Sequence, residues 1–204
     1  MGDPVAHSLS PTVHNAAFSA AGLDMVYVPL PVRTRDVGDA VRGLAALGFR
    51  GANVTVPHKG AVIPYLDWLD GDARLAQAVN TIVVEDGMLR GYNTDIDGAR
   101  TALVDACGDS LRGARALVLG AGGAARAVGL ALARLGAELT VVNRSGAGGE
   151  RLAALVEAAV PGAASRWLPL DRLTATDVAH QGLLVNATSL GMAGAGKVPA
   201  SLVD

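Results

Sequence analysis

A glycine-rich turn between an apolar run and an alanine-rich segment constrains this chain most. Gly120, Gly122 and Ala125 fit the pattern G-x-G-x-x-G/A and directly follow the apolar run 116–119. In a strand–turn–helix context, the first glycine permits the tight turn and the second lets the backbone approach a pyrophosphate. The small third residue lets the helix lie close to the strand, and the helix N-terminus offers free N–H groups to the phosphates. We therefore expect a dinucleotide-binding βαβ unit; a merely tight strand–helix turn is the alternative.

The end of the next predicted strand, 138–143, indicates which dinucleotide is bound. An NAD site places an acid there to bond the ribose 2′-hydroxyl, whereas this chain has Asn143, Arg144 and Ser145. A guanidinium pairs well with a 2′-phosphate, and a hydroxyl can donate a further hydrogen bond. The sequence therefore favours NADP over NAD, unless Arg144 is only a solvated loop residue.

Apolar runs of strand length alternate with amphipathic segments of helix length along all 204 residues, a pattern that predicts an α/β fold. In the first half we expect strands at 25–30, 51–56 and 81–85, then a turn at Asp86-Gly87 and a short return strand. Helices are expected there at 10–21, 34–47, 60–69 and 94–106. In the second half we expect strands at 114–119, 138–143 and 182–186, with helices at 124–135 and 150–159.

The polar, glycine-containing stretch 107–113 marks a boundary between two domains. Residues 1–106 are expected to form an α/β domain with a mixed, mostly parallel sheet. Residues 107–204 are expected to form a Rossmann domain.

Composition and charge exclude several classes of partner. The formal net charge of −2 gives no electrostatic footprint for nucleic acid or an anionic membrane. The single cysteine, Cys107, cannot form an internal disulfide, and the most apolar segment, 128–142, is interrupted by Arg134 and Glu138. We therefore expect a cytoplasmic protein with a small-molecule substrate, without a signal peptide, membrane span or nucleic-acid partner.

Short polar motifs in the first half fall at predicted strand ends or helix starts, where an open α/β sheet places its ligands. They are HSLSP at 7–11, NVTVPHK at 53–59, AVNT at 78–81 and GYNTD at 91–95. Lys59 is one of only two lysines, and a lysine can exchange protons where an arginine cannot. We expect these motifs to form one polar pocket in which Asp95 pairs with Lys59.

The ordered motifs HSLSP, NVTVPHK, AVNT, GYNTD, GAGGAAR, NRS and NATSLGM resemble the shikimate dehydrogenase family over nearly the whole chain. The resemblance implies a substrate-binding first domain and an NADP-binding second domain. It also implies reversible reduction of 3-dehydroshikimate to shikimate, a step of aromatic amino acid (chorismate) biosynthesis. Because family members begin with an earlier strand and continue beyond NATSLGM, we expect this chain to be shortened at both ends. A monomer or homodimer is expected.

The resemblance also implies roles for individual residues. Ser8 and Ser10 would bond the substrate carboxylate. The ring hydroxyls would be bonded by Thr55, Asn80 and Asp95, while Lys59 would exchange the proton with Asp95 as its partner. The cofactor would be held by Gly120, Ala121, Gly122, Gly123, Ala124, Asn143, Arg144, Ser145, Thr188 and Ser189.

The four histidines show no spacing typical of metal ligands, so no metal is expected. His7 and His14 are interpreted as structural, and His58 is expected to face solvent.

Other functions remain open. A quinate/shikimate dehydrogenase would share most of these motifs, although members that prefer NAD should carry an acid near Asn143. A non-catalytic NADP-binding or regulatory module would bind NADP without turnover. Residues 114–192 alone would also suit a glutamyl-tRNA reductase, but the first half offers no nucleophilic cysteine to support that hypothesis.

Overall fold

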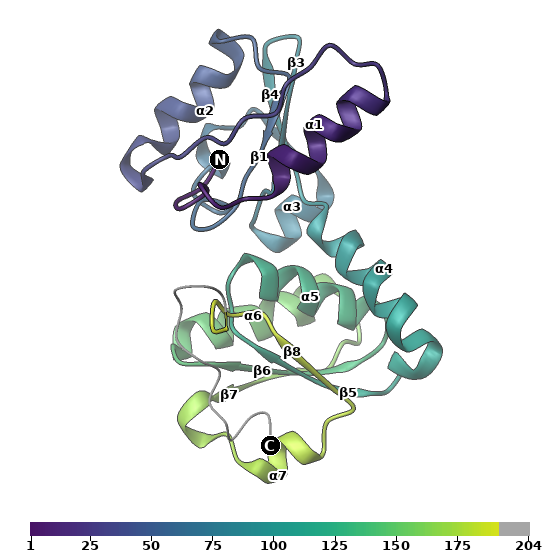
Figure 1. Cartoon of the computed structure of the whole chain (residues 1–204). Coiled ribbons are helices and arrows are strands. Elements are labelled where there is room, and N and C mark those ends of the chain that lie inside the picture. The colour runs from purple at the N-terminus through teal and green to yellow at the C-terminus, as the bar shows by residue number, and fades with distance from the viewer. Residues whose placement is uncertain (192–204) are drawn as a thin grey trace. The chain divides into compact units, whose positions relative to one another are not determined.

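The computed structural model describes residues 1–191, apart from the side chain of residue 109. Contacts divide the chain into two compact units, residues 1–93 and 94–204, and both are of the α/β class (Figure 1). Residues 192–204, which the predicted second domain includes, lie outside the described residues. The division falls one helix ahead of the expected boundary at 106/107, because helix α4 (Asp95–Cys107) packs along α5 (Gly123–Arg134).

The first unit contains a four-stranded sheet in the order β1-β3-β4-β2. Its strands are β1 (Gly51–Asn53), β2 (Trp68–Leu69), β3 (Thr81–Glu85) and β4 (Met88–Tyr92). The sheet is mixed, as predicted, but β1–β3 and β3–β4 are antiparallel and only β2–β4 is parallel. The expectation of a mostly parallel sheet is therefore wrong for these strands. The β3–β4 hairpin is confirmed: Asp86 and Gly87 have φ values of 51° and 78°, as a type I′ turn requires.

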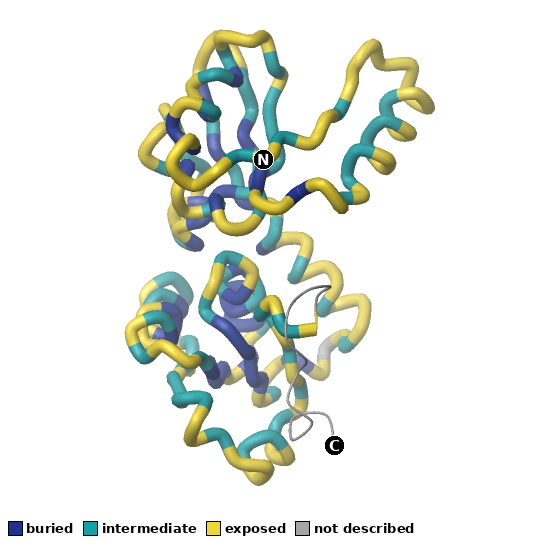
Figure 2. The backbone as a smooth tube through the Cα atoms, turned by 60° about the vertical axis from the view of Figure 1, so that its left-hand side comes forward, coloured by how far each residue is buried: buried dark blue, intermediate teal, exposed yellow. Residues whose placement is uncertain are grey.

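The α-helices in the described part of this unit are α1 (Ser10–Ala20), α2 (Val37–Ala46) and α3 (Gly71–Ala76), with 3₁₀ turns at η1 (Thr34–Asp36) and η2 (Ile63–Tyr65). Val41 and Leu44 on α2 are buried in a core shared with Val62, Val79 and Ile82. By contrast, α1 carries no buried residue, so its tube in Figure 2 contains no dark blue segment. The predicted helices 10–21 and 34–47 are confirmed.

Two predicted elements of this unit are wrong. Segment 25–30 forms no strand, because a strand requires a ladder partner and only Gly2 bridges this region, at Pro31. The predicted helix 60–69 is absent because Pro64 lacks an N–H donor and disfavours helical geometry in the residue before it. The chain forms η2 and β2 in this region instead, and helix α3 begins after them at Gly71.

The second unit contains a sheet in the order β7-β6-β5-β8, and all of its pairings are parallel. Its strands are β5 (Arg115–Leu119), β6 (Glu138–Asn143), β7 (Ser165–Pro169) and β8 (Leu183–Asn186). Its remaining helices are α6 (Gly146–Ala159), α7 (Ala175–Ala179) and the 3₁₀ turns η3 (Gly108–Leu111) and η4 (Leu170–Arg172). Helices α5 and α6 cover one face of the sheet and α7 lies on the other (Figure 1). Strands β6 and β7 follow β5 on one side of the sheet, whereas β8 joins β5 on the other side, so the strand order reverses at β5 as in a Rossmann fold. The predicted Rossmann architecture is confirmed.

Strand β7 and the first turn of α6 were not predicted. Strand β7 ends at Pro169, which a sheet tolerates here because β7 is an edge strand that pairs, among the described strands, with β6 alone. The glycine-rich start of α6 resembles a loop in composition. A Cβ at Gly149 would overlap the Trp167 ring, so glycine lets the helix lie against that side chain.

Within residues 1–191, no helix combines the length and the apolar composition needed to cross a membrane.

Candidate functional site

The second unit gathers its predicted cofactor residues at the carboxyl edge of its sheet. Leu119 at the end of β5 aligns with Val142 of β6 on one side and with Asn186 of β8 on the other. The segments that follow these three strands therefore emerge together. They carry the glycine turn 120–124, Asn143-Arg144-Ser145 and Thr188-Ser189. This is the edge at which open parallel sheets bind ligands.

The first two glycines of the turn pattern have different geometries. Gly120 has φ of +107°, and a Cβ there would lie 3.0 Å from the carbonyl oxygen of Ala187. Gly122 precedes α5 with φ of −78° and is exposed, and in the described part of the chain no atom lies within 4 Å of a Cβ built on it. Because no side chain of residues 1–191 caps this helix, its first N–H groups are available to phosphate oxygens.

The edge beyond β6 suits a phosphorylated ribose. Asn143 donates from Nδ2 to the carbonyl oxygen of Ser145 at 3.0 Å, which holds the turn, while Arg144 and Ser145 are exposed. Across β5, the backbone N–H and the hydroxyl of Thr188 both donate to Oδ1 of Asn186, at 3.0 and 2.7 Å. Ser189 follows as an exposed residue. The residues present therefore fit a dinucleotide with a 2′-phosphate.

In the first unit, a small hollow of about 130 Å³ gathers three of the predicted substrate residues, Ser8, Ser10 and Thr55. Tyr27 and Asn53 also line it. The Ser10 N–H donates to the Ser8 hydroxyl at 3.2 Å, which keeps the two serines together at the start of α1. Hydroxyl and amide groups of this kind can receive a carboxylate through hydrogen bonds.

A continuous row of hydrogen bonds leads from this hollow to Asn80. The Tyr27 hydroxyl is bonded to Ser10 and donates to Oδ1 of Asn53 at 3.0 Å. Asn53 Nδ2 donates to the Thr81 hydroxyl at 3.4 Å, which in turn donates to Oδ1 of Asn80 at 3.0 Å. Sequence reasoning did not select Tyr27, while Asn53 and Thr81 lay within quoted motifs but received no role.

Lys59 is brought beside this row by backbone bonds. The carbonyl oxygen of Lys59 accepts from the N–H of Val79 at 2.7 Å, and the Asn80 N–H donates to Tyr92 at 3.0 Å. Asn93 donates from Nδ2 to Ala78 at 2.8 Å. Hydrogen bonds therefore join the end of the motif 53–59 and residues 92–93 to the motif 78–81, at the start of β3.

Asp95, the expected partner of Lys59, is the first residue of α4 and belongs to the second unit. It follows Asn93 by two residues in the chain. Its half-buried carboxylate stands in the first helical turn, where the helix dipole favours negative charge.

The expectation that His58 faces solvent is wrong. Its side chain is fully buried, and Nε2 lies 2.6 Å from the carbonyl oxygen of Val32. Two backbone hydrogen bonds fix the turn at His58: its N–H donates to the Thr55 carbonyl, and its own carbonyl accepts from the N–H of Val62. This turn directs the ring inward. His14 stacks on Tyr27 with ring centroids 4.5 Å apart, as suits a structural residue.

Burial raises the pKa of Tyr27, and the hydrogen bond with Ser10 opposes this shift. The proton of Tyr27 is therefore bound more tightly in the folded state, so its contribution to stability is complete below the ordinary tyrosine pKa of about 10 and is lost at higher pH.

We expect Tyr27→Phe to lower the free energy of unfolding by about 1 kcal/mol at neutral pH, because the bonds to Asn53 and Ser10 are lost. It should also reduce the loss of stability at high pH. Urea unfolding at a series of pH values measures both effects. Tyr65→Phe is the matched control. Equal changes in the free energy of unfolding and in its pH dependence for both variants would show that the Tyr27 hydroxyl has no special role.

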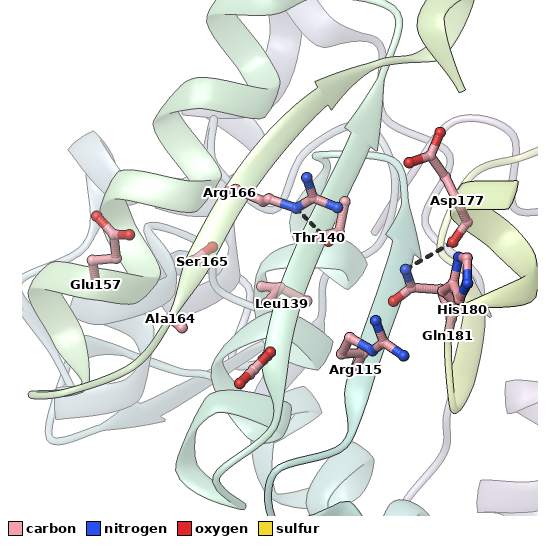
Figure 3. Close-up of a pocket in the computed structure, with 11 residues that line it drawn as sticks. Arg115, Leu139, Thr140, Glu157, Ala164, Ser165, Arg166, Asp177, His180 and Gln181 are labelled. Atoms are coloured by element: carbon pink, nitrogen blue, oxygen red, sulfur yellow. Dashed lines mark hydrogen bonds between the residues drawn. The ribbon is translucent and has the colours of Figure 1, made fainter. Parts of the chain in front are cut away.

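A polar hollow of the second unit is not part of this edge. It has a volume of about 440 Å³ and is lined near the amino ends of the strands, by residues such as Arg115 and Glu138 (Figure 3). Arg166 points into it and donates from Nε to the Thr140 hydroxyl at 3.1 Å. The glycine turn lies at the opposite ends of the same strands, so this hollow is separate from the cofactor edge.

The parallel sheet, its strand order and the glycine turn define a two-unit α/β protein of the dinucleotide-binding class. Residues 1–82 match the family description "Shikimate dehydrogenase substrate binding domain". The chain is 50% identical over 194 residues to the shikimate dehydrogenase (NADP(+)) of Geobacter metallireducens, and this match covers 94% of this chain and 68% of that protein. The chain therefore belongs to the shikimate dehydrogenase family.

Solved structures of related enzymes are consistent with this family membership. A shikimate dehydrogenase in complex with NADP+ is 41% identical, with a TM-score of 0.85 over 95% of this chain and 66% of its own. The enzyme from Thermus thermophilus, in complex with NADP(H) and shikimate, is 36% identical, with a TM-score of 0.80 over 98% of this chain and 72% of its own. A quinate dehydrogenase from Corynebacterium glutamicum in complex with NAD is 29% identical, with a TM-score of 0.83 over 98% of this chain and 71% of its own. The chain thus spans about two thirds of the length of its relatives.

Proposed function

We propose that this chain acts as an NADP-dependent shikimate dehydrogenase, an oxidoreductase of the CH–OH group that interconverts 3-dehydroshikimate and shikimate. The observation that carries the proposal is the polar row from Ser8 and Ser10 to Asn80, with the backbone of Lys59 bonded beside it. The shikimate dehydrogenase (NADP(+)) of Geobacter metallireducens and the Thermus thermophilus enzyme in complex with NADP(H) and shikimate support it.

The row suits a molecule with a carboxylate at one end and hydroxyls at the other. Ser8 and Ser10 would receive the carboxylate, while Thr55, Asn80 and Asp95 would bond the ring hydroxyls. In a hydroxyl-lined carboxylate site only the acceptor is charged, so the site lacks the opposite charge and the two parallel donors that an arginine would supply. It therefore depends on preorganisation, which the bonds from Tyr27 to Ser10 and Asn53 supply.

The cofactor would be held by the backbone of residues 120–124, by Thr188-Ser189 on the nicotinamide side, and by Asn143-Arg144-Ser145 around the 2′-phosphate. NADPH, when bound, supplies the hydride.

Lys59 would polarise the substrate carbonyl and give its proton to the oxygen as the alcohol forms. In the reverse direction, neutral Lys59 would accept that proton. Asp95 would orient the ammonium and complete the proton path. General acid catalysis of this kind contributes about 10²–10⁴-fold to a rate.

A steady-state assay of NADP+ reduction by shikimate tests the proposal. We expect turnover with NADP+ and shikimate, and calorimetric binding of each ligand to the folded chain. Folded protein that binds NADP+ without turnover would instead support the non-catalytic NADP-binding module. Faster turnover of quinate than of shikimate would favour the quinate/shikimate alternative.

Arg144→Ala should weaken NADP+ binding by about 10–100-fold, because a charge-assisted bond to the 2′-phosphate is lost. Binding of NAD+, which lacks that phosphate, should change little. Isothermal titration with both nucleotides measures the effect. Arg115→Ala, which removes an exposed guanidinium at the amino end of β5, opposite the proposed edge, serves as control. Equal losses for NADP+ and NAD+ in Arg144→Ala would contradict the role.

A further inference from the structure

The turn that carries Lys59 has a single inward side chain. Val54 and Val62 are buried at the two ends of this turn, and His58 is the one buried residue between them. The proposed reaction gives His58 no part in proton transfer. Burying a polar ring costs free energy unless hydrogen bonds compensate for the loss of water. The hydrogen bonds of His58 therefore indicate what the ring does for the turn.

One nitrogen of the ring has a partner and the other has none. Nε2 of His58 lies 2.6 Å from the carbonyl oxygen of Val32, and because a carbonyl oxygen can only accept, Nε2 carries a proton and donates it. Nδ1 is buried and has no hydrogen-bond partner among the described residues. The tautomer that fits this geometry is a neutral imidazole with its proton on Nε2, and its bond ties the turn to Val32.

Val32 is itself anchored to the start of the chain. Its N–H donates to the carbonyl oxygen of Gly2 at 3.1 Å. The preceding residue, Met1, accepts at its carbonyl oxygen from the N–H of Thr55 at 2.9 Å, and the carbonyl oxygen of Thr55 accepts from the N–H of His58 at 2.9 Å. The bond from His58 to Val32 therefore closes a circuit of hydrogen bonds that holds the turn in place.

Lys59 directly follows this anchored ring. On one side of it, the carbonyl oxygen of His58 accepts from the N–H of Val62 at 3.1 Å; on the other, the carbonyl oxygen of Lys59 accepts from the N–H of Val79 at 2.7 Å. The backbone of Lys59 is thus fixed at two successive residues. Such fixing matters for a group that transfers a proton, because a misplacement of about 1 Å can slow a reaction about 10²-fold.

We propose that His58 is a positioning residue for Lys59. Its neutral ring fastens the turn 55–59 to Val32 and so fixes the point from which the Lys59 ammonium reaches the substrate. His58 exchanges no proton with the substrate, because the ring is buried and its N–H is held by Val32. This inference rests on the proposed function, since His58 acts through Lys59.

Two substitutions separate the hydrogen bond of His58 from the volume of its ring. His58→Phe keeps an aromatic ring but removes the donor to Val32. His58→Gln keeps an N–H donor, which its side chain extends about as far from the backbone as Nε2. Val41→Ala, which shortens a fully buried side chain on α2, is the control for a loss of stability alone.

Amide hydrogen exchange without ligand and steady-state kinetics with shikimate are measured for these variants and the parent, well below Tm. We expect His58→Phe to speed exchange of the Val79 amide, which donates to Lys59, by about tenfold or more. Its kcat should fall about 10–100-fold, with NADP+ affinity unchanged. His58→Gln should restore most of both, and Val41→Ala should lower Tm but keep kcat within about twofold of the parent.

Unchanged exchange of the Val79 amide in His58→Phe would overturn the proposal, because His58 would then not hold the turn. Faster exchange with the kcat of the parent would also overturn it, because the ring would be only structural. A parent chain without turnover would contradict the proposed function, and calorimetric affinity for shikimate would then replace kcat. Weaker binding in His58→Phe, restored in His58→Gln, would still support the role of His58, whereas equal binding in all variants would overturn it.

Discussion

Lys59→Met is expected to lower kcat for shikimate oxidation by about 10²–10⁴-fold, the contribution of a positioned general acid–base group. The variant should bind NADP+ as tightly as the parent, because the proposed cofactor residues belong to the other compact unit. Methionine retains most of the length of the lysine side chain, which limits the loss of packing at this half-buried position. Steady-state kinetics together with titration of NADP+ measures the split between kcat and cofactor affinity.

Lys59→Arg separates charge from proton exchange. Arginine keeps the positive charge but stays protonated, so it can polarise a carbonyl without accepting a proton in shikimate oxidation. We expect this variant to remain nearly as slow as Lys59→Met. Activity within about threefold of the parent in either variant would show that Lys59 is not the proton-exchanging group.

Gly120→Ala is expected to lower the free energy of unfolding by about 1–3 kcal/mol. At φ of +107° an L-residue is strained, and its Cβ would also lie 3.0 Å from the Ala187 carbonyl oxygen and 3.2 Å from Cγ2 of Thr188. The backbone oxygen cannot move without shifting the segment that follows β8. Urea unfolding and Tm measure the loss of stability.

Gly122→Ala is the matched control for that variant. A Cβ at Gly122 meets no atom within 4 Å, and its φ of −78° suits alanine. Stability should therefore stay within about 0.5 kcal/mol, while NADP+ affinity falls because the methyl group occupies the space that a pyrophosphate would approach. If Gly122→Ala bound NADP+ like the parent, the glycine turn would have only a structural role.

Local sequence patterns predicted the elements whose partners are near in the chain. Strand β5, the turn at Gly120 and helix α5 are consecutive in the chain, and the local sequence of each favours the conformation that it adopts. The β3–β4 hairpin was equally local, because Asp86-Gly87 itself supplies the required backbone conformation.

Elements that depend on distant contacts were missed. Segment 25–30 has strand-like composition, but a ladder partner is a property of the whole sheet. Strand β7 carries Pro169, which only its edge position permits.

The same distinction holds for the candidate site. The motif residues could be selected from their chemistry, and several lie together in the described structure. Tyr27 could not, because its role arises from hydrogen bonds to Ser10 and Asn53 in two separate motifs. Thr81 lies in the motif 78–81, but its role depends on the bond from Asn53. For Tyr27, the expected strand at 25–30 was the only signal, and it indicated packing.

The contact between Trp167 and the first turn of α6 gives this protein an internal optical reporter. The chain has two tryptophans, Trp68 in the first unit and Trp167 in the second. Trp167 lies against Gly146 and Gly149 in the first turn of α6, which directly follows Arg144 and Ser145. Its indole nitrogen is buried and has no hydrogen-bond partner among the described residues. After Trp68→Phe, fluorescence would report on the second unit alone, and nucleotide binding beside α6 would change its emission.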